Sequence, residues 1–307
     1  MTAVVETSES SRDGPLLAGS IAVVAWGFGP LIVRGISASS TSIIVFRVGF
    51  AVPVMIAAAY LLGGRITWPI IRQACVPGVL FFGSIVTSFA SYQHTSIALA
   101  TLIPAVQPAL VLFLAPRVFG ERSSRRQIYC AVCALLGVGG VVLAAGRSIG
   151  AHMTGNLLAV ANLLLWTVYF VQVKRVRATG VHSWSFLAAV FTVCAVFAVP
   201  YGLIASNDLG AVGGRDWILI SLIILGPGLV GHGLMTWAQR HLDITVASLM
   251  TLGNPVISAT GAWLIFGEGL RPLQLLFAMV VLGAITGIVV DARAGAVAET
   301  GLSGPAE

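Results

Sequence analysis

Long apolar stretches alternate with short polar connections along almost the whole chain. Ten of these stretches reach the ~20 residues that an α-helix needs to cross a hydrocarbon core about 30 Å thick. They are continuously apolar, without the strict alternation of barrel strands, and therefore predict helices. Gly, Ser, Asn and Asp in the connections mark the helix ends. The expected spans are residues 16–35, 41–62, 72–92, 97–117, 126–146, 155–175, 183–205, 217–238, 244–265 and 271–291.

The composition agrees with a protein that lies in a lipid bilayer. Apolar residues make up 57% of the chain and charged residues 9%, and the mean hydropathy is +0.97, which excludes an ordinary soluble domain. The net charge of +6 comes from basic residues in short connections, which indicates membrane topology rather than nucleic acid binding. With both termini inside, twelve Lys and Arg lie on the inner side and four on the outer side. The positive-inside rule therefore predicts cytoplasmic termini.

An internal repeat divides the chain into two halves. The segment "VQPALVLFLAPRVFGERSSRRQ" at 106–127 matches "GNPVISATGAWLIFGEGLRPLQ" at 253–274, with an offset of 147 residues. Each half holds five expected helices, an odd number, so the second half must insert upside down relative to the first. This predicts an all-α polytopic membrane protein of ten transmembrane helices, built as two inverted five-helix repeats, an arrangement typical of transporters.

The domain boundaries follow from this repeat. We expect a disordered cytoplasmic tail at 1–15, the first five-helix repeat at 16–147, the second at 148–292, and a second disordered cytoplasmic tail at 293–307. The first fifteen residues mix both charge signs and lack a small-residue cleavage pattern, so we expect no cleaved signal peptide.

The two repeated segments resemble the paired signatures of EamA-like carriers in the drug/metabolite transporter superfamily. In that pattern a helix centred on proline closes on a Gly-Glu pair, here Pro108 with Glu121 and Pro255 with Glu268. Arg47 in "FRVGF" matches the family's arginine in the second helix, and the second half lacks an equivalent. The resemblance implies a secondary transporter of the inner membrane that exports amino acids or other small metabolites.

Two ionisable residues inside spans are candidate substrate contacts, because such residues are expensive in the membrane and usually functional. Arg47 lies near the start of its span, so an ion pair or an anchor at the outer interface is the structural alternative to a substrate or gate contact. His232 lies in the glycine-rich segment "GPGLVGHGLMTW" and could carry protons or bind a carboxylate. A hydrogen-bonded packing histidine is the alternative.

Aromatic and amide side chains complete the candidate substrate cavity. Trp and Tyr can wall an amphipathic pocket or form a belt at the membrane interface, and amides can bind a ligand or join helices. Asn162 and Gln172 are further amides within spans. The predicted cavity residues besides Arg47 and His232 are Trp26, Tyr92, Gln93, Gln107, Trp166, Tyr169, Trp237 and Asn254.

The remaining sequence features concern scaffold and class. Pro108 and Pro255 are expected to kink their helices, and Glu121 and Glu268 to mark helix ends. No Asp or Glu lies in the middle third of any expected span, which argues against lipophilic cations as substrates. No enzyme motif is present, so we expect neither an enzyme nor a metal or cofactor site.

The expected partners are a small-molecule metabolite and the lipid bilayer. Nucleic acid is not expected. Gly283 and Gly287 form a close-packing motif that predicts helix packing within a monomer, with a homodimer as the alternative. The predicted location is the cell inner (plasma) membrane. A membrane-embedded sensor and an uptake carrier are the alternatives to an exporter.

Overall fold

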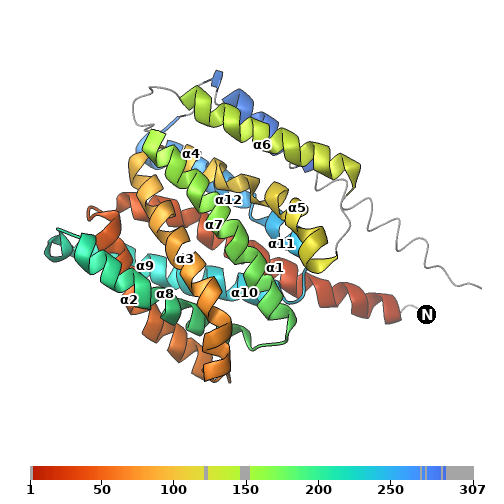
Figure 1. Cartoon of the computed structure of the whole chain (residues 1–307), viewed down its shortest axis with the longest axis horizontal. Coiled ribbons are helices and arrows are strands. Elements are labelled where there is room, and N and C mark those ends of the chain that lie inside the picture. Colours follow the sequence, from red (N-terminus) through yellow and green to blue (C-terminus); the bar gives the residue numbers. More distant parts are fainter. Residues whose placement is uncertain are drawn as a thin grey trace, which may run out of the picture.

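The protein is an all-α bundle in the part of the chain that the structure describes. This computed structural model describes residues 3–120, 124–145, 153–269, 272, 273, 275–284, 286 and 287. The regular elements among these residues are all helices, packed side by side (Figure 1). Glu121 and the predicted tail at 293–307 lie outside the described residues. The fold class of an all-α polytopic membrane protein is therefore confirmed.

The first half contains five expected spans, and its helices follow them closely. Helix α1 begins at Ala3 and so includes residues 3–15 of the segment 1–15 that the sequence assigns to a disordered tail. Extending an existing helix adds one hydrogen bond per residue fixed, whereas nucleating a helix is costly. The elements are α1 (Ala3–Gly35), α2 (Ser40–Leu61), α3 (Trp68–His94), α4 (Ile97–Leu102), η1 (Pro104–Val106), α5 (Gln107–Phe119) and α6 (Arg125–Ala145).

The second half follows its expected spans in the same way, with the eighth and ninth divided into shorter pieces. An apolar helix over Leu275–Ala284 lies at the position expected for the tenth span. The other elements are α7 (Met153–Ala178), α8 (Ser183–Ala205), η2 (Leu209–Ala211), α9 (Gly214–Ile223), η3 (Ile224–His232), α10 (Gly233–Ala238), α11 (Ile244–Met250) and α12 (Gly253–Phe266).

Eight helical segments in the described residues are long and apolar enough to cross a membrane. Helix α6 and the Leu275–Ala284 helix occupy the positions expected for the fifth and tenth spans, and the count of ten stays a prediction. The eight segments are Gly14–Gly35, Ser40–Leu61, Trp68–His94, Ile97–Phe119, Met153–Ala178, Ser183–Ala205, Gly214–Ala238 and Ile244–Phe266.

The two spans that carry the repeated prolines are interrupted just before these residues. Helix α4 ends at Leu102 and α5 begins at Gln107, so Pro108 lies in the first turn of α5. Helix α11 ends at Met250 and α12 begins at Gly253, which puts Pro255 in the first turn of α12. Proline has no backbone N–H and is tolerated in a first turn, where that donor is not needed. Each expected kink is therefore a break in the helix.

Helices of different halves pack directly against one another. Helix α3 packs on α7 and α8, α2 packs on α8, and α1 packs on α12 and on the segment from α9 to α10. The largest hydrophobic core joins both halves, with Ile43 and Phe81 of the first half beside Phe186 and Phe191 of the second. The centre of the molecule therefore lies between the halves.

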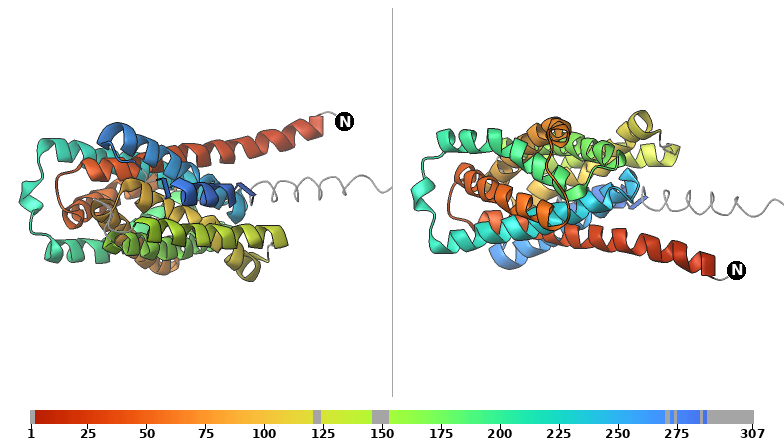
Figure 2. Two further views of the ribbon diagram at one scale, coloured as in Figure 1. Left: turned by 90° about the horizontal axis from the view of Figure 1, so that it is seen from above. Right: turned by 90° about the horizontal axis from the view of Figure 1, so that it is seen from below.

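The bundle has two ends, which Figure 2 shows far apart along its long axis. One end holds the α8–α9 connection and the C-terminal end of α1, and we call it the Arg34 end. At the other, the Lys174 end, Gly14 of α1 lies against Trp237 of α10. At 1.5 Å per residue, the helix between Gly14 and Arg34 is about 30 Å long. The two ends are thus about one hydrocarbon thickness apart.

Candidate substrate cavity

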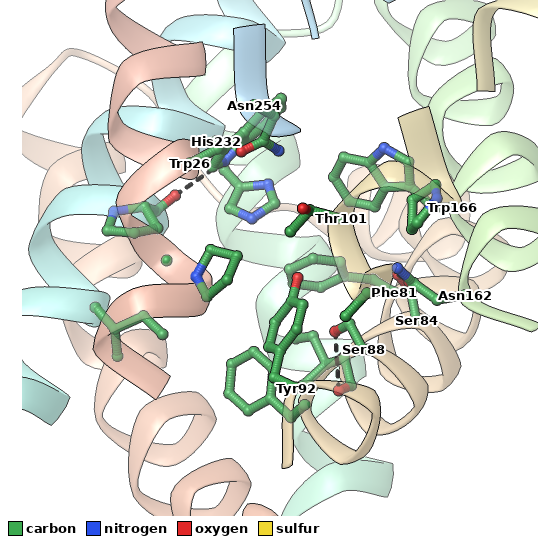
Figure 3. Close-up of a pocket in the computed structure, with 18 of the residues that line it drawn as sticks. Trp26, Phe81, Ser84, Ser88, Tyr92, Thr101, Asn162, Trp166, His232 and Asn254 are labelled. Atoms are coloured by element: carbon green, nitrogen blue, oxygen red, sulfur yellow. Dashed lines mark hydrogen bonds between the residues drawn. The ribbon is translucent and has the colours of Figure 1, made fainter. Parts of the chain in front are cut away.

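A cavity of about 120 Å³ lies between the two halves, within the membrane-spanning helices. The first half contributes residues of α1, α2, α3, α4 and η1, and the second contributes residues of α7, α9, η3 and α12. Figure 3 shows these side chains around a common space. The lining includes Pro104 and Thr251, which lie at the two interrupted helices. Interrupted helices expose polar backbone, which is tolerated at membrane depth only where it lines a cavity or is buried in protein.

Aromatic rings form the walls of this cavity. The rings of Trp26 and Trp166 meet edge to face with centroids 5.5 Å apart. The His232 ring lies 5.1 Å from Trp26 and 4.9 Å from Phe81, again edge to face. Trp26 is held in place because its Nε1 donates a hydrogen bond of 3.2 Å to the Pro227 carbonyl. These rings make the cavity amphipathic, with large apolar faces and few polar atoms.

Helix η3 brings both Pro227 and His232 to the cavity. Residues Ile224–His232 form a π-helical segment within an otherwise α-helical span. Such segments are rare and frequently occur at functional sites. Pro227 and three glycines in this stretch explain the change in winding, because proline removes a backbone donor and glycine packs without a side chain.

Neutral hydrogen-bonding groups lie along α3 and α7. The Ser84 hydroxyl donates to Asn162 Oδ1 at 2.7 Å across the two halves, and Ser88 donates to the Ile85 carbonyl at 3.2 Å. Both serines face the cavity (Figure 3). Asn254 also lines it, and its Oδ1 is buried without a hydrogen-bond partner. The cavity therefore offers several uncharged polar contacts.

Arg47 brings a positive charge to the cavity. Its side chain is 4% exposed, and its Nε and Nη1 atoms are buried without hydrogen-bond partners. The guanidinium carbon lies 5.0 Å from the centroid of the Phe89 ring, as in a cation–π contact. Among the described residues, no Asp or Glu lines the cavity. Among the described residues Arg47 has no ion pair, and its burial differs from the exposed position expected of an anchor at the interface.

The structure brings six of the ten predicted cavity residues together. Trp26, Arg47, Tyr92, Trp166, His232 and Asn254 all line the cavity. Whether they contact a substrate stays a prediction.

The other four predicted residues lie elsewhere. Gln93 bonds the α1–α2 connection instead, accepting from the Ser40 amide at 2.8 Å and donating to the Ala38 carbonyl at 3.1 Å. Tyr169 is 3% exposed and stacks on Phe81 behind the wall. Gln107 is buried and accepts a hydrogen bond from Thr251. Trp237 is 36% exposed and contacts His241 at the Lys174 end.

Several lining residues were not predicted from the sequence. Ser84 and Ser88 lie four residues apart on one helix face, and this spacing of small polar residues in an apolar helix was a usable signal. Phe81 and Phe89 carried no signal, because a phenylalanine in a span is equally expected to face lipid or core. Asn162 is one of several amides within the expected spans.

Hydrogen-bonded groups link several helices at the Arg34 end beside the cavity. Arg34 Nη1 donates to the Tyr92 carbonyl at 2.7 Å, and Nη2 donates to the Thr95 carbonyl at 3.3 Å. Arg34 also pairs with Glu268 at 2.5 Å, and the second oxygen of Glu268 accepts from the Ile97 amide at 2.8 Å. Glu268 therefore follows the end of α12, at the position expected for a helix-end residue, and joins both halves.

A similar arrangement occupies the Lys174 end. Lys174 Nζ donates to the Gln239 carbonyl at 2.9 Å and to the Leu242 carbonyl at 2.6 Å. We call these two groups the Arg34 clamp and the Lys174 clamp. Within the described residues, no cluster of His, Cys, Asp and Glu has the arrangement of a metal site.

Comparison with known proteins supports two similar halves. The model of a family described as "EamA-like transporter family" matches residues 14–143 and again residues 153–290. The WAT1-related protein At3g02690, chloroplastic, of Arabidopsis thaliana is 26% identical over 207 residues, which are 63% of this chain and 48% of that protein. The chain thus spans about half the length of this relative.

A solved structure shares the fold of the whole chain. This crystal structure has a TM-score of 0.70 and 19% sequence identity, and the match covers 92% of this chain and 99% of the other. At this identity the likeness concerns the fold alone.

Proposed function

This chain belongs to the EamA-like transporter family, and we propose that it is a secondary transporter that exports amino acids or other small metabolites from the cell. The observation that carries the proposal is the cavity between the two halves, at the depth of the interrupted helices. Family membership and the membrane-spanning helices point to transport rather than catalysis. The proposed location is the inner (plasma) membrane, with both termini in the cytoplasm because of the excess of basic residues on that side.

We further propose that the two halves are inverted five-helix repeats, which gives ten spans in all. Two sets of contacts support this. In the clamps, Arg34 binds the carbonyls of Tyr92 and Thr95, and Lys174 binds those of Gln239 and Leu242, which follow the first two carbonyls by 147 residues. Because the two clamps lie at opposite ends of the bundle, equivalent positions of the halves point in opposite directions.

The second set of contacts joins α6 to Phe277 and Gly287 near the end of the described residues. Gly140 packs against the ring of Phe277, and Gly287 packs against the sulfur of Cys130. Gly287 follows Gly140 by 147 residues, and Phe277 follows Cys130 by the same number. Exchange of the two halves therefore converts one contact into the other, as a two-fold axis requires. These contacts also favour packing of Gly287 within a monomer over a homodimer.

Alternating access follows from this symmetry. The cavity lies between a clamp at each end, so opening of one clamp while the other stays closed would expose the substrate to one side of the membrane at a time. The Arg34 clamp includes the ion pair with Glu268, which links α1 of the first half to the end of α12. On the proposed orientation this clamp closes the outer side.

Transport is tested by blocking the cavity. Ser88→Trp fills the space beside Arg47, and Leu136→Trp is a matched control because Leu136 is 70% exposed on α6. We expect cells with Ser88→Trp, like a deletion strain, to accumulate inside the compound that wild-type cells release, by several-fold. Cells with Leu136→Trp should match the wild type. Mass spectrometry of medium and cytosol measures both pools.

Reconstitution separates a carrier from other membrane proteins. Purified protein in liposomes should show counterflow of the compound that accumulates in the deletion strain. A single-channel current without counterflow, or equal counterflow by the wild type and Ser88→Trp, would contradict the carrier mechanism.

A further inference from the structure

The charge of the cavity is unbalanced. Arginine stays protonated in proteins, and Arg47 holds its charge within a membrane-spanning helix. A buried charge is costly unless a partner compensates it. The contact with Phe89 supplies part of that compensation, but the acidic side chains of the described residues all lie outside the cavity lining. A ligand with a negative charge would provide the missing partner.

The guanidinium is in a position to bind such a ligand. Its Nε and Nη1 atoms are fully buried and unpaired, its Nη2 is not among the fully buried atoms, and the side chain lines the cavity. Arginine binds carboxylates with a planar fork of donors and with short, charge-assisted hydrogen bonds. Tyr92 and Asn254, which line the same cavity, are uncharged and can donate hydrogen bonds to the remaining oxygen lone pairs.

The same lining disfavours an ammonium group on the ligand. An amino acid would bring its ammonium close to Arg47 together with its carboxylate, and the lining described here holds no carboxylate to receive it. Like charges in a desolvated site repel each other strongly. The electrostatics therefore favour a monoanion over a zwitterion or a cation.

The size and walls of the cavity define the rest of the ligand. The volume is about 120 Å³, and an engineered protein cavity of ~150 Å³ holds benzene. The rings of Trp26, Trp166 and Phe81 offer apolar faces to such a body. A molecule of about one ring with a short acidic arm fits both the space and the charge.

Building on the proposed function, we propose that the cargo is a small monocarboxylate with an apolar body, in which Arg47 binds the carboxylate and Trp26 and Trp166 contact the body. Arg47 thus determines specificity for charge, and the tryptophans determine specificity for shape. Within the broad class of metabolites, this selects organic acids over amino acids.

Four probes with one apolar body test the charge specificity. 3-Phenylpropanoate is an anion, 3-phenylpropanamide is neutral, phenylalanine is a zwitterion and 3-phenylpropylamine is a cation. Each is titrated into the purified full chain in detergent, and tryptophan fluorescence and thermal shift report binding. We expect the anion to bind about tenfold or more tighter than each of the other three, because hydrogen bonds to charged groups are the stronger ones.

Substitutions at Arg47 test the residue. Arg47→Met should weaken binding of the anion far more than binding of the amide and so abolish the preference for the anion, and Arg47→Lys should keep part of the preference. Arg117→Met is the matched control, because Arg117 lies at the end of α5 and bonds its own helix at Phe113. It should bind all four probes like the wild type.

Each result has a defined meaning. Equal or tighter binding of the zwitterion, the amide or the cation overturns the proposal, as does the absence of binding by all four probes. An anion preference that survives Arg47→Met also overturns it. The wild-type comparison decides the matter if Arg47 variants do not fold. Anion-selective binding without counterflow would refute the transporter and leave the anion specificity intact. Counterflow of phenylalanine that is insensitive to Arg47→Met would support the transporter and refute the anion specificity.

Discussion

Two tryptophans of the cavity, Trp26 in the first half and Trp166 in the second, meet ring against ring and differ in one hydrogen bond. Trp26 donates from Nε1 to the Pro227 carbonyl, which ties α1 to the π-helical segment η3. Trp166 makes ring contacts with Trp26 and Tyr169, and no described residue accepts a hydrogen bond from its indole. The pair therefore allows the hydrogen bond to be separated from the ring contacts.

At this scale we expect Trp26→Phe to cost more stability than Trp166→Phe. Both variants replace an indole by the same smaller ring, but only Trp26→Phe leaves the buried Pro227 carbonyl without its indole donor. The difference in the free energy of unfolding should be about 1 kcal/mol. Thermal or denaturant unfolding of both variants in one detergent measures it. Equal losses would mean that the hydrogen bond contributes little.

At the scale of elements, a carboxylate in the α8–α9 connection holds the beginning of α2. Asp208 accepts hydrogen bonds from the amide and the hydroxyl of Ser39, each at 2.6 Å, and from the Ser42 hydroxyl. Ser39 is the residue that caps α2, so the carboxylate lies at the positive end of that helix. Partial burial acts to raise the pKa of Asp208, but the hydrogen bonds outweigh it and lower the pKa below its ordinary value.

This lowered pKa predicts how stability depends on pH. The ionised Asp208 stabilises the folded protein at pH values above the ordinary pKa of 3.8, and this contribution is lost as the pH falls through the lower, folded-state pKa. Asp208→Asn should therefore lower the melting temperature at pH 7 and have a smaller effect near pH 3. Asp243→Asn is the control, since Asp243 is exposed at the start of α11 and its side chain makes no capping hydrogen bond. An equal effect of Asp208→Asn at both pH values would contradict the role of the charge.

At the scale of the whole molecule, the proposed alternating access assigns the two clamps the role of gates at the ends of the cavity. The Arg34 clamp joins three helices through a charged pair, and charge-assisted hydrogen bonds are the strong ones. Weakening one clamp should shift the equilibrium toward the state that is open at that end. If the halves are inverted repeats, weakening the clamp at either end should open the cavity at that end.

Cysteine labelling measures this shift. In a variant without the four native cysteines, Ser88→Cys places one thiol in the cavity. We expect Glu268→Gln to raise its labelling by an impermeant maleimide from the Arg34 side about fivefold, and Lys174→Met to raise it from the other side. Arg215→Met, at the Arg34 end but outside the clamp, should have no effect. Labelling that is independent of both clamps would exclude them as gates.

The residues of the cavity could be predicted only in part. Trp26, Arg47, Trp166 and His232 stood out because polar and amphipathic side chains are rare and costly inside a span. The same criterion selected Trp237, which the structure places at 36% exposure near the Lys174 end. The residue type at a position indicates which environments that residue tolerates. Whether the residue faces the cavity depends on which helices pack beside its own helix.

The sequence by itself determined the apolar helices that can span a membrane and the repeat of the chain, because hydrophobic length and matched spacing can be read directly from the order of residues. The tertiary structure decided which side chains share the cavity, because α3 packs against α7 and α8 of the other half. It also decided that Arg47 has no acidic partner among the cavity-lining residues described. Charge compensation depends on contacts between residues far apart in the chain, and no local pattern records them.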